Sequence, residues 1–148
     1  MRRKGAAKVR SMIYLDTCVI VSFIDEADAN HTRALRLVER LGEERIVSRL
    51  TLLELASVYS RAGLEEPLPL TVYSVRAVGA RLVNLDFNEV LREAFAKAPL
   101  LRFRTLDLLH LVACKAAGCE EFATLDAGIV GKSEVIRREL GVKVVTAV

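Results

Sequence analysis

The sequence of 148 residues contains no tryptophan and no glutamine, and it has few aromatic residues, three prolines and three cysteines. Cys18, Cys114 and Cys119 form no paired metal-binding or redox motif, and their odd number favours reduced, mostly buried thiols. No apolar run approaches the roughly 18 residues that a membrane span requires. The start does not resemble a signal peptide, because Asp16 interrupts the first apolar stretch. These absences argue against a paired-cysteine site and a membrane protein, and they favour a cytoplasmic location.

The composition indicates one globular domain. Hydrophobic residues make up 52% of the chain and charged residues 28%, and the length fits a single core. Residues 1–11 contain five basic residues and no acid, and removing their charge from the net +3 leaves −2 for the remainder. We expect residues 1–11 to be a basic tail and residues 12–148 to be the domain. A flexible, solubilising end is the commoner form of such a tail, and contact with nucleic acid or a membrane surface is the alternative.

Short β-branched or apolar segments alternate with helical periodicity along the chain. The expected strands are 12–15, 45–48, 81–85, 121–125 and 143–146. The expected helices are 17–25, 31–41, 51–63, 70–79, 88–97 and 105–118, with a loop at the two prolines of "LEEPLPL" and a stop at Pro99. Strands that alternate with helices of this length predict an α/β fold, in which helices cover both faces of a mostly parallel five-stranded sheet as a three-layer sandwich.

Four acids are expected to meet at one edge of this sheet. Asp16 and Asp126 directly follow the first and fourth predicted strands, whose carboxyl ends share an edge in a parallel sheet. Glu54 and Asp107 lie in the first turns of predicted helices capped by Thr51 and Thr105. Helices that return antiparallel to the strands begin at that same edge.

Carboxylates packed together repel one another and resist desolvation, so such a cluster is costly unless cations or protons neutralise it. Mg²⁺ or Mn²⁺ prefers oxygen ligands and accepts phosphate oxygens as further ligands. Two such ions about 4 Å apart could activate water for phosphodiester cleavage. The pattern therefore favours a metal-dependent hydrolase.

Each acid also has a structural interpretation. Glu54 could form a capping box with Thr51, Asp107 could favour the helix dipole, and Asp126 could open a turn before Gly128. Asp16 is the hardest to explain structurally, because an isolated charge inside an apolar run is costly.

Several further side chains could join the site. Thr17 and Thr124 place hydroxyls beside two of the acids, although strand and cap preferences explain threonine there more often. His110 follows Asp107 by one turn, and a hydrogen-bonded packing histidine is its commoner role. Arg102 and Arg104 could meet substrate phosphates, or they could be solvated loop charges. Asp86 could also join, depending on strand order, whereas a solvated turn is expected for three further acids, Asp25, Glu26 and Asp28.

The segments "YLDTCVIV", "TLLELASV", "TLDLLHLVA" and "FATLDAGI" together resemble the PIN domain nucleases, especially the VapC-type toxins. The resemblance covers nearly the whole chain from Met12. It places the family's metal-binding acids on Asp16, Glu54, Asp107 and Asp126, with Thr124 assisting. It implies the strand order 3-2-1-4-5, which would leave Asp86 remote from the metal. Family members commonly have another acid or an aromatic residue after the last Asp, where this chain has Ala127, Gly128 and Ile129.

The resemblance also implies Mg²⁺-dependent endoribonuclease activity on RNA, a homodimer formed through helices, and inhibition by a cognate antitoxin. Two alternatives stay open from the sequence. A non-catalytic PIN module would bind RNA or protein without cleavage. A phospho-accepting receiver-like domain would use Asp86 as its acceptor, but such a domain needs adjacent acids after the first strand, and Asp16 stands alone.

Overall fold

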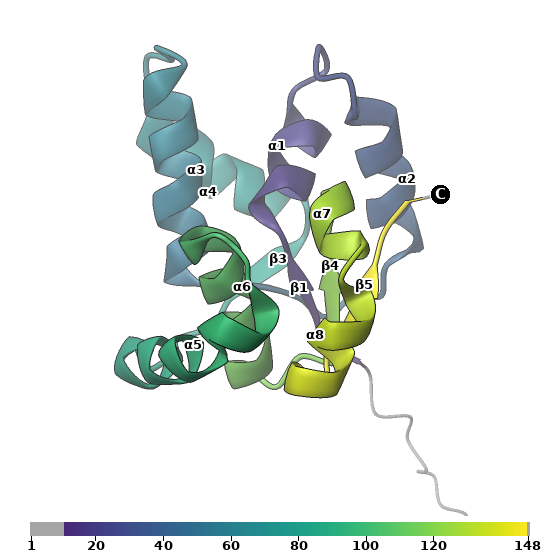
Figure 1. Ribbon diagram of the computed structural model, residues 1–148. Helices are drawn as coiled ribbons and strands as arrows, with labels where there is room; N and C mark the ends of the chain where they lie inside the picture. The colour runs from purple at the N-terminus through teal and green to yellow at the C-terminus, as the bar shows by residue number, and fades with distance from the viewer. Residues whose placement is uncertain (1–10, 148) are drawn as a thin grey trace, which may run out of the picture.

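The computed structural model describes residues 11–147, so the expected basic tail lies outside the described residues apart from Ser11. The strands are β1 (Ile13–Leu15), β2 (Arg45–Val47), β3 (Ala80–Leu82), β4 (Glu121–Ala123) and β5 (Lys143–Val145). The helices are α1 (Thr17–Ile24), α2 (His31–Arg40), α3 (Arg49–Arg61), α4 (Pro67–Ala77), α5 (Phe87–Leu101), α6 (Thr105–Ala116), α7 (Ala127–Val130) and α8 (Ser133–Leu140). Figure 1 shows these elements in place. No helix within 11–147 is long and apolar enough to cross a membrane.

The five strands form one parallel sheet in the order β3-β2-β1-β4-β5. This arrangement confirms the predicted fold and strand order. β1 and β4 are neighbours in the middle of the sheet, with Leu15 opposite Ala123. The chain leaves β1 toward β2 on one side and enters β4 on the other, so the carboxyl ends of these two strands flank the switch point where open α/β sheets bind ligands.

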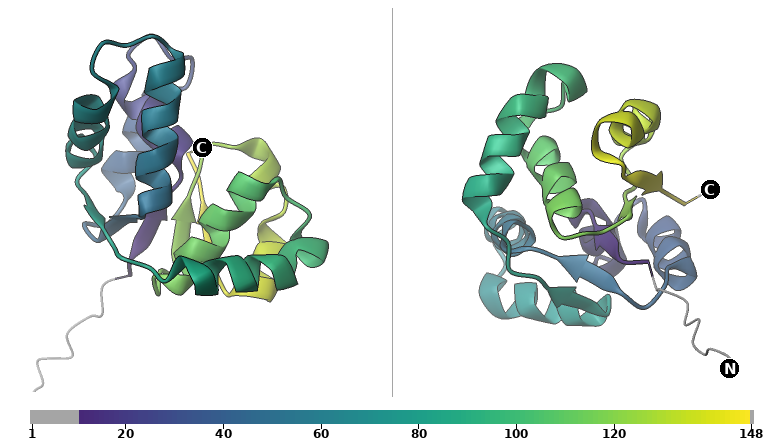
Figure 2. Two further views of the ribbon diagram at one scale, coloured as in Figure 1. Left: turned by 90° about the vertical axis from the view of Figure 1, so that its left-hand side faces the viewer. Right: turned by 90° about the horizontal axis from the view of Figure 1, so that it is seen from below.

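Helices cover both faces of the sheet, and the alternation of side chains along β1 shows how the layers divide. Ile13 and Leu15 point into a cluster built with α1, α2, α3 and α4, whereas Tyr14 points into the opposite cluster with α5, α6, α7 and α8. The left view of Figure 2 shows the two groups of helices on either side of the strands. Strands covered on both faces explain why the first apolar run has no polar alternation.

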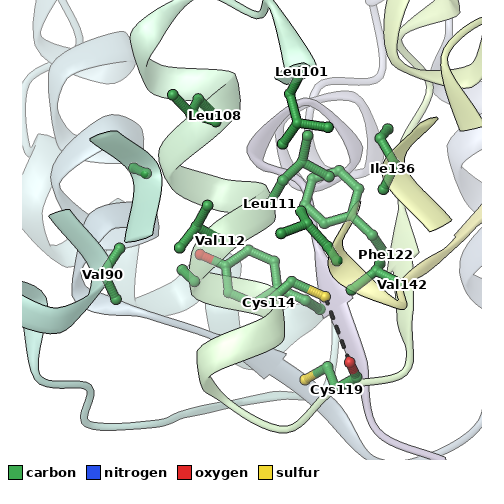
Figure 3. Packing of buried hydrophobic residues seen from close by; sticks show 14 of the residues in the cluster. Val90, Leu101, Leu108, Leu111, Val112, Cys114, Cys119, Phe122, Ile136 and Val142 are labelled. Atoms are coloured by element: carbon green, nitrogen blue, oxygen red, sulfur yellow. Dashed lines mark hydrogen bonds between the residues drawn. The ribbon is translucent and has the colours of Figure 1, made fainter. Parts of the chain in front are cut away.

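The second cluster is a close-packed core around Phe122 (Figure 3). The ring of Phe122 stacks on that of Tyr14 with centroids 5.8 Å apart. Cys114 and Cys119 lie buried in this core, and the Cys114 thiol donates to the Cys119 carbonyl. All cysteines in the described part of the chain are free, and Cys114 and Cys119 are buried.

Two helices have an N-cap that differs from the one indicated by the sequence. Ser48, and not Thr51, is the N-cap of α3, and the two residues form a capping box in which Thr51 occupies the third helical position. The alternative capping box of Thr51 with Glu54 is therefore wrong, and Glu54 is free to serve another purpose. α6 likewise takes Arg104 as its N-cap, so Thr105 is its first helical residue.

Prolines do not break the chain where they were expected to. Pro67 and Pro69 lie in the first turn of α4, where the missing N–H groups have no helical partner in any case. Pro99 lies inside α5, which continues to Leu101 and ends with Arg102 in the left-handed conformation, at φ 57°. Two predictions are therefore wrong: the prolines of "LEEPLPL" lie in a helix and not in a loop, and Pro99 does not stop α5. α7 and α8 are short and were not delimited from the sequence.

Candidate functional site

Asp16 lies at the carboxyl end of β1, where it is the N-cap residue of α1. Its side chain is only 6% exposed. The Thr124 hydroxyl donates to Oδ2 of Asp16 at 2.7 Å, and the Cys18 thiol donates to the same oxygen at 3.4 Å. Burial raises the pKa of Asp16, although the charge of His110 and these hydrogen bonds oppose the rise. Both donors bind the same oxygen, Oδ2.

Thr124 connects Asp16 with Asp126. Its hydroxyl donates to Asp16 and accepts the backbone N–H of Asp126 at 3.0 Å. Asp126 is the N-cap of α7, and its Oδ1 accepts the N–H of Gly128 at 2.7 Å. A Cβ atom at Gly128 would lie 3.1 Å from that oxygen, so glycine suits the close approach. The two acids thus lie at the same edge of the sheet, as predicted.

Asp107 lies in the first turn of α6 and is half-buried. Burial raises its pKa, and the negative charges of Asp16 and Asp126 raise it further. The charge of Glu54 acts in the same direction, while that of His110 opposes it. Asp107 is therefore within electrostatic reach of all three other predicted acids, which is the convergence that the sequence predicted.

Glu54 projects from α3 and bonds to a buried histidine. Nε2 of His110 lies 2.8 Å from Oε1 of Glu54, and Nδ1 lies 2.9 Å from the hydroxyl of Tyr14. Burial alone would raise the pKa of Glu54, but hydrogen bonds from His110 and Thr17 and the charges of His110 and Arg61 lower it overall. Glu54 is therefore kept ionised. His110 is a hydrogen-bonded buried histidine, as expected, and one of its partners is a site residue.

A pocket of about 450 Å³ opens beside these acids. Two carboxylates and three cations line it, together with apolar and glycine residues: Arg102, Phe103, Arg104, Asp107, Asp126, Gly128, Ile129 and Lys132. Asp16 and Glu54 are not in its wall. The predicted position of Arg102 and Arg104 near the acids is correct. Among residues 11–147, no group of three or more His, Cys, Asp and Glu side chains is arranged so that it could hold a metal ion by itself.

The other acids considered from the sequence lie elsewhere. Asp86 caps α5 by accepting the N–H of Asn88, and it follows β3 at the far side of the sheet. Asp25 and Asp28 accept backbone N–H groups in the turn between α1 and α2. These three acids therefore have structural roles, and Asp86 is remote from the site, as the expected strand order implied.

Three residues near the site were missed. The Tyr14 hydroxyl contacts His110, and a hydroxyl within the apolar run "MIYL" was the available signal. The Cys18 thiol donates to Asp16, two residues earlier in the chain. A search for paired cysteine motifs does not detect such a contact. Lys132 donates to the carbonyls of Leu101 and Arg102 and lies over the Phe103 ring, so it fixes the pocket wall. No local sequence pattern marks Lys132.

Comparison with known proteins shows which family the chain belongs to. The family model of the PIN domain matches residues 13–132. The chain belongs to the PIN domain family. A curated relative from Mycobacterium tuberculosis, named Ribonuclease VapC35, is 35% identical over 107 residues, which span 72% of this chain and 76% of the relative.

Solved PIN domain structures share the fold. VapC20 from Mycobacterium tuberculosis, described as a sarcin-ricin loop cleaving toxin, superposes with a TM-score of 0.67 at 15% identity and covers 80% of this chain and 93% of its own. A toxin-antitoxin complex from Klebsiella pneumoniae gives 0.60 at 13% identity and covers 82% and 92%. VapBC2 from Rickettsia felis, bound to a DNA fragment from its promoter, gives 0.56 at 16% identity and covers 93% and 100%. At these identities the likeness concerns the fold alone.

Membership of the PIN domain family excludes one of the two alternatives drawn from the sequence. The receiver-like interpretation is wrong, because the family match covers both strands that carry the acids and Asp86 is occupied as a helix cap. The non-catalytic PIN module keeps the same fold, and activity measurements separate it from a nuclease.

Proposed function

We propose that this PIN domain is a metal-dependent endoribonuclease that serves as the toxin of a toxin-antitoxin pair. The observation that carries the proposal is the convergence of Asp16, Asp107 and Asp126 at the switch point, with Glu54 close enough to influence the pKa of Asp107. The name of the curated relative, Ribonuclease VapC35, supports the same activity.

The donor chemistry of the site fits a hydrated Mg²⁺ ion, with Mn²⁺ as a substitute. Mg²⁺ keeps several of its waters and is commonly held by only one or two carboxylates, so a preformed cage of three ligands is not required. A buried carboxylate with a raised pKa, as at Asp16, is stabilised by a nearby cation. Asp16, Glu54, Asp107 and Asp126 would hold the metal. When bound, the ion would supply Lewis-acid polarisation of the phosphate and activation of water.

The protein side chains have separate tasks in this scheme. Thr124 orients Asp16 and the backbone of Asp126 through its two hydrogen bonds. Glu54, with its lowered pKa, is anionic at neutral pH and is therefore suited to bind a cation. No described side chain acts as a covalent nucleophile in the scheme, because Cys18, the thiol at the site, has its pKa raised to about 12 by burial.

RNA fits the pocket electrostatically. Arg102, Arg104 and Lys132 line a pocket that also contains Asp107 and Asp126. Because a polyanion is repelled by carboxylates alone, cations beside them are needed to place a phosphate next to the acids. Arg102 and Arg104 would contact phosphates that flank the scissile bond.

A homodimer and an antitoxin partner belong to the same proposal. Large apolar side chains are exposed on α3 and α5, with Phe95 85% and Leu53 69% exposed. Phe87, Leu91 and Phe95 repeat every four residues along α5, and Phe87 and Leu53 line one apolar pocket between the two helices. Exposed apolar area of this kind marks protein interfaces. We assign it to a second copy of the chain, and we propose that an antitoxin covers the pocket lined by Asp107 and Asp126.

RNA cleavage by purified protein tests the proposal. Mg²⁺ should support cleavage of a structured RNA, a chelator should stop it, and adding Mg²⁺ back should restore it. Asp16→Asn, Glu54→Gln, Asp107→Asn and Asp126→Asn should each reduce the rate by about 100-fold or more, as loss of a directly acting group commonly does.

Asp86→Asn is the matched control, because Asp86 also follows a strand but caps a helix away from the site, and asparagine is an equally good cap. This variant should cleave at the wild-type rate. Chelator-resistant cleavage, or full activity in Asp16→Asn, would contradict the site assignment. RNA binding without any cleavage would favour the non-catalytic PIN module.

A further inference from the structure

His110 is almost completely buried, at 1% exposure, and both of its ring nitrogens are hydrogen-bonded. A carboxylate can only accept a hydrogen bond, so Nε2 of His110 donates to Oε1 of Glu54. On the other side of the ring, Nδ1 shares a hydrogen bond with the Tyr14 hydroxyl. The histidine therefore bridges Glu54 and the central strand β1.

The bridge continues back to the helix that carries Glu54. The Tyr14 hydroxyl lies 2.8 Å from Oγ of Ser48 and 3.4 Å from Oγ1 of Thr51, and these two residues form the capping box of α3. The network thus leaves α3 at its cap, passes through β1 and α6, and returns to α3 at Glu54. All of its members except Glu54 are buried. Its geometry fixes the start of α3 and the Glu54 side chain together.

The network gives Glu54 a fixed hydrogen-bond donor at Oε1. Glutamate has three rotatable side-chain bonds, and the Glu54 side chain is 26% exposed, so without a partner it would sample several rotamers. His110 holds Oε1, and the Thr17 hydroxyl further stabilises the carboxylate. When a side chain that hydrogen-bonds to a metal-binding residue is removed, metal affinity or activity commonly falls by 10- to 100-fold.

We propose that His110 is a positioning residue, which holds the Glu54 carboxylate through Nε2 so that the carboxylate stays in place at the proposed cation site. This role rests on the proposed function. The competing interpretation is that the network only ties β1, α3 and α6 together for stability. The two interpretations differ in what happens to cation affinity when the donor is removed and then supplied again.

The test uses Mn²⁺ as the probe and measures its affinity by calorimetry on the full chain. His110→Leu removes the donor at similar volume, and affinity should fall by about 10- to 100-fold. His110→Gln keeps an amide N–H that can reach Glu54, and it should recover most of the affinity. His31→Leu is the matched control, because His31 bonds to the Ser22 carbonyl away from the site, and its affinity should equal that of wild type.

Wild-type Mn²⁺ affinity in a folded His110→Leu protein would overturn the positioning role, and equal losses in the leucine and glutamine variants would do the same. If His110→Leu fails to fold, His110→Asn replaces it, because its amide is too short to reach Glu54 and its affinity should fall as predicted for leucine, whereas Tyr14→Phe keeps the Nε2 contact and should lose less than threefold. If wild type binds no Mn²⁺, the proposed function fails. The positioning role is then judged from metal-free crystal structures. Glu54 should occupy one rotamer in wild type and in His110→Gln, and several rotamers in His110→Leu.

Discussion

Replacing Thr124 with valine removes one hydroxyl from the centre of the site and leaves the side-chain volume almost unchanged. The hydroxyl is fully buried, donates to the Asp16 carboxylate at 2.7 Å and accepts the Asp126 N–H at 3.0 Å. A hydrogen bond to a charged group contributes about 1.5 to 3 kcal/mol, and a neutral one about 1 kcal/mol. The Asp126 N–H is only partly buried, so in the valine variant it can hydrogen-bond to water instead. We therefore expect a total loss of about 2 to 4 kcal/mol in the free energy of unfolding.

The loss should depend on pH in a defined direction. The hydrogen bond from Thr124 lowers the pKa of Asp16 relative to what burial alone would give. A contact that lowers the folded-state pKa of an acid stabilises the ionised form, so its contribution is present at high pH and is lost as pH falls through that pKa. The difference in unfolding free energy between wild type and Thr124→Val should therefore be largest at pH 8 and should shrink as the pH is lowered.

Urea unfolding of the metal-free protein, with Thr124→Ser as the matched variant, measures the effect. Serine keeps the hydroxyl and loses one methyl group, so it should cost only about 1 kcal/mol. A loss of about 3 kcal/mol in the valine variant corresponds to a melting temperature lower by roughly 6 to 12 °C. If valine costs no more than serine, or if its cost grows as the pH falls, the assigned role of the Thr124 hydroxyl is refuted.

Three further predictions follow from the site and the surface. Burial raises the pKa of Asp16 and of Asp107, so without metal the folded protein should gain stability as the pH falls through these raised pKa values toward about 4, the value of an unperturbed Asp. Urea titrations should show this gain in wild type and a smaller one in Asp16→Asn, and an equal gain in both proteins would contradict it. Cys18, with a pKa of about 12, should resist iodoacetamide at pH 8 in the folded protein and react after unfolding, as read by mass spectrometry; rapid labelling in the native state would show that its thiol is not buried as described. Phe95→Glu should convert a dimer to a monomer in light-scattering measurements while the circular dichroism spectrum stays that of the folded protein, whereas Arg92→Glu on the same helix should leave the dimer intact; an unchanged mass in Phe95→Glu would exclude this face from the dimer.

Much of the fold could be predicted because the signals were local. Strands of β-branched residues alternated with amphipathic segments, and this pattern alone predicts a parallel sheet with helices on both faces. The positions of Asp16 and Asp126 followed from the same rule, since both acids come after buried strands. Their convergence required only that the two strands be parallel and adjacent.

Other features depended on contacts between distant residues. Tyr14 meets His110 across 96 positions, and Glu54 meets it across 56, so no spacing pattern could indicate the bridge. The start of α3 was misplaced because Ser48 and Thr51 are both good caps, and in the structure Ser48 is the cap while Thr51 completes its capping box from the third helical position. The prolines of α4 and α5 were interpreted as breaks because the position of a proline within a helix, and not its presence, decides whether it is tolerated.

The most direct test of the central claim is an anomalous-scattering map from crystals of this PIN domain soaked in Mn²⁺. We predict a peak at the carboxyl ends of β1 and β4, with Asp16 or its neighbours Asp107 and Asp126 as direct ligands and the remaining coordination by water. A peak elsewhere, or none at a Mn²⁺ concentration that supports full RNA cleavage, would contradict the claim that these acids form the metal site.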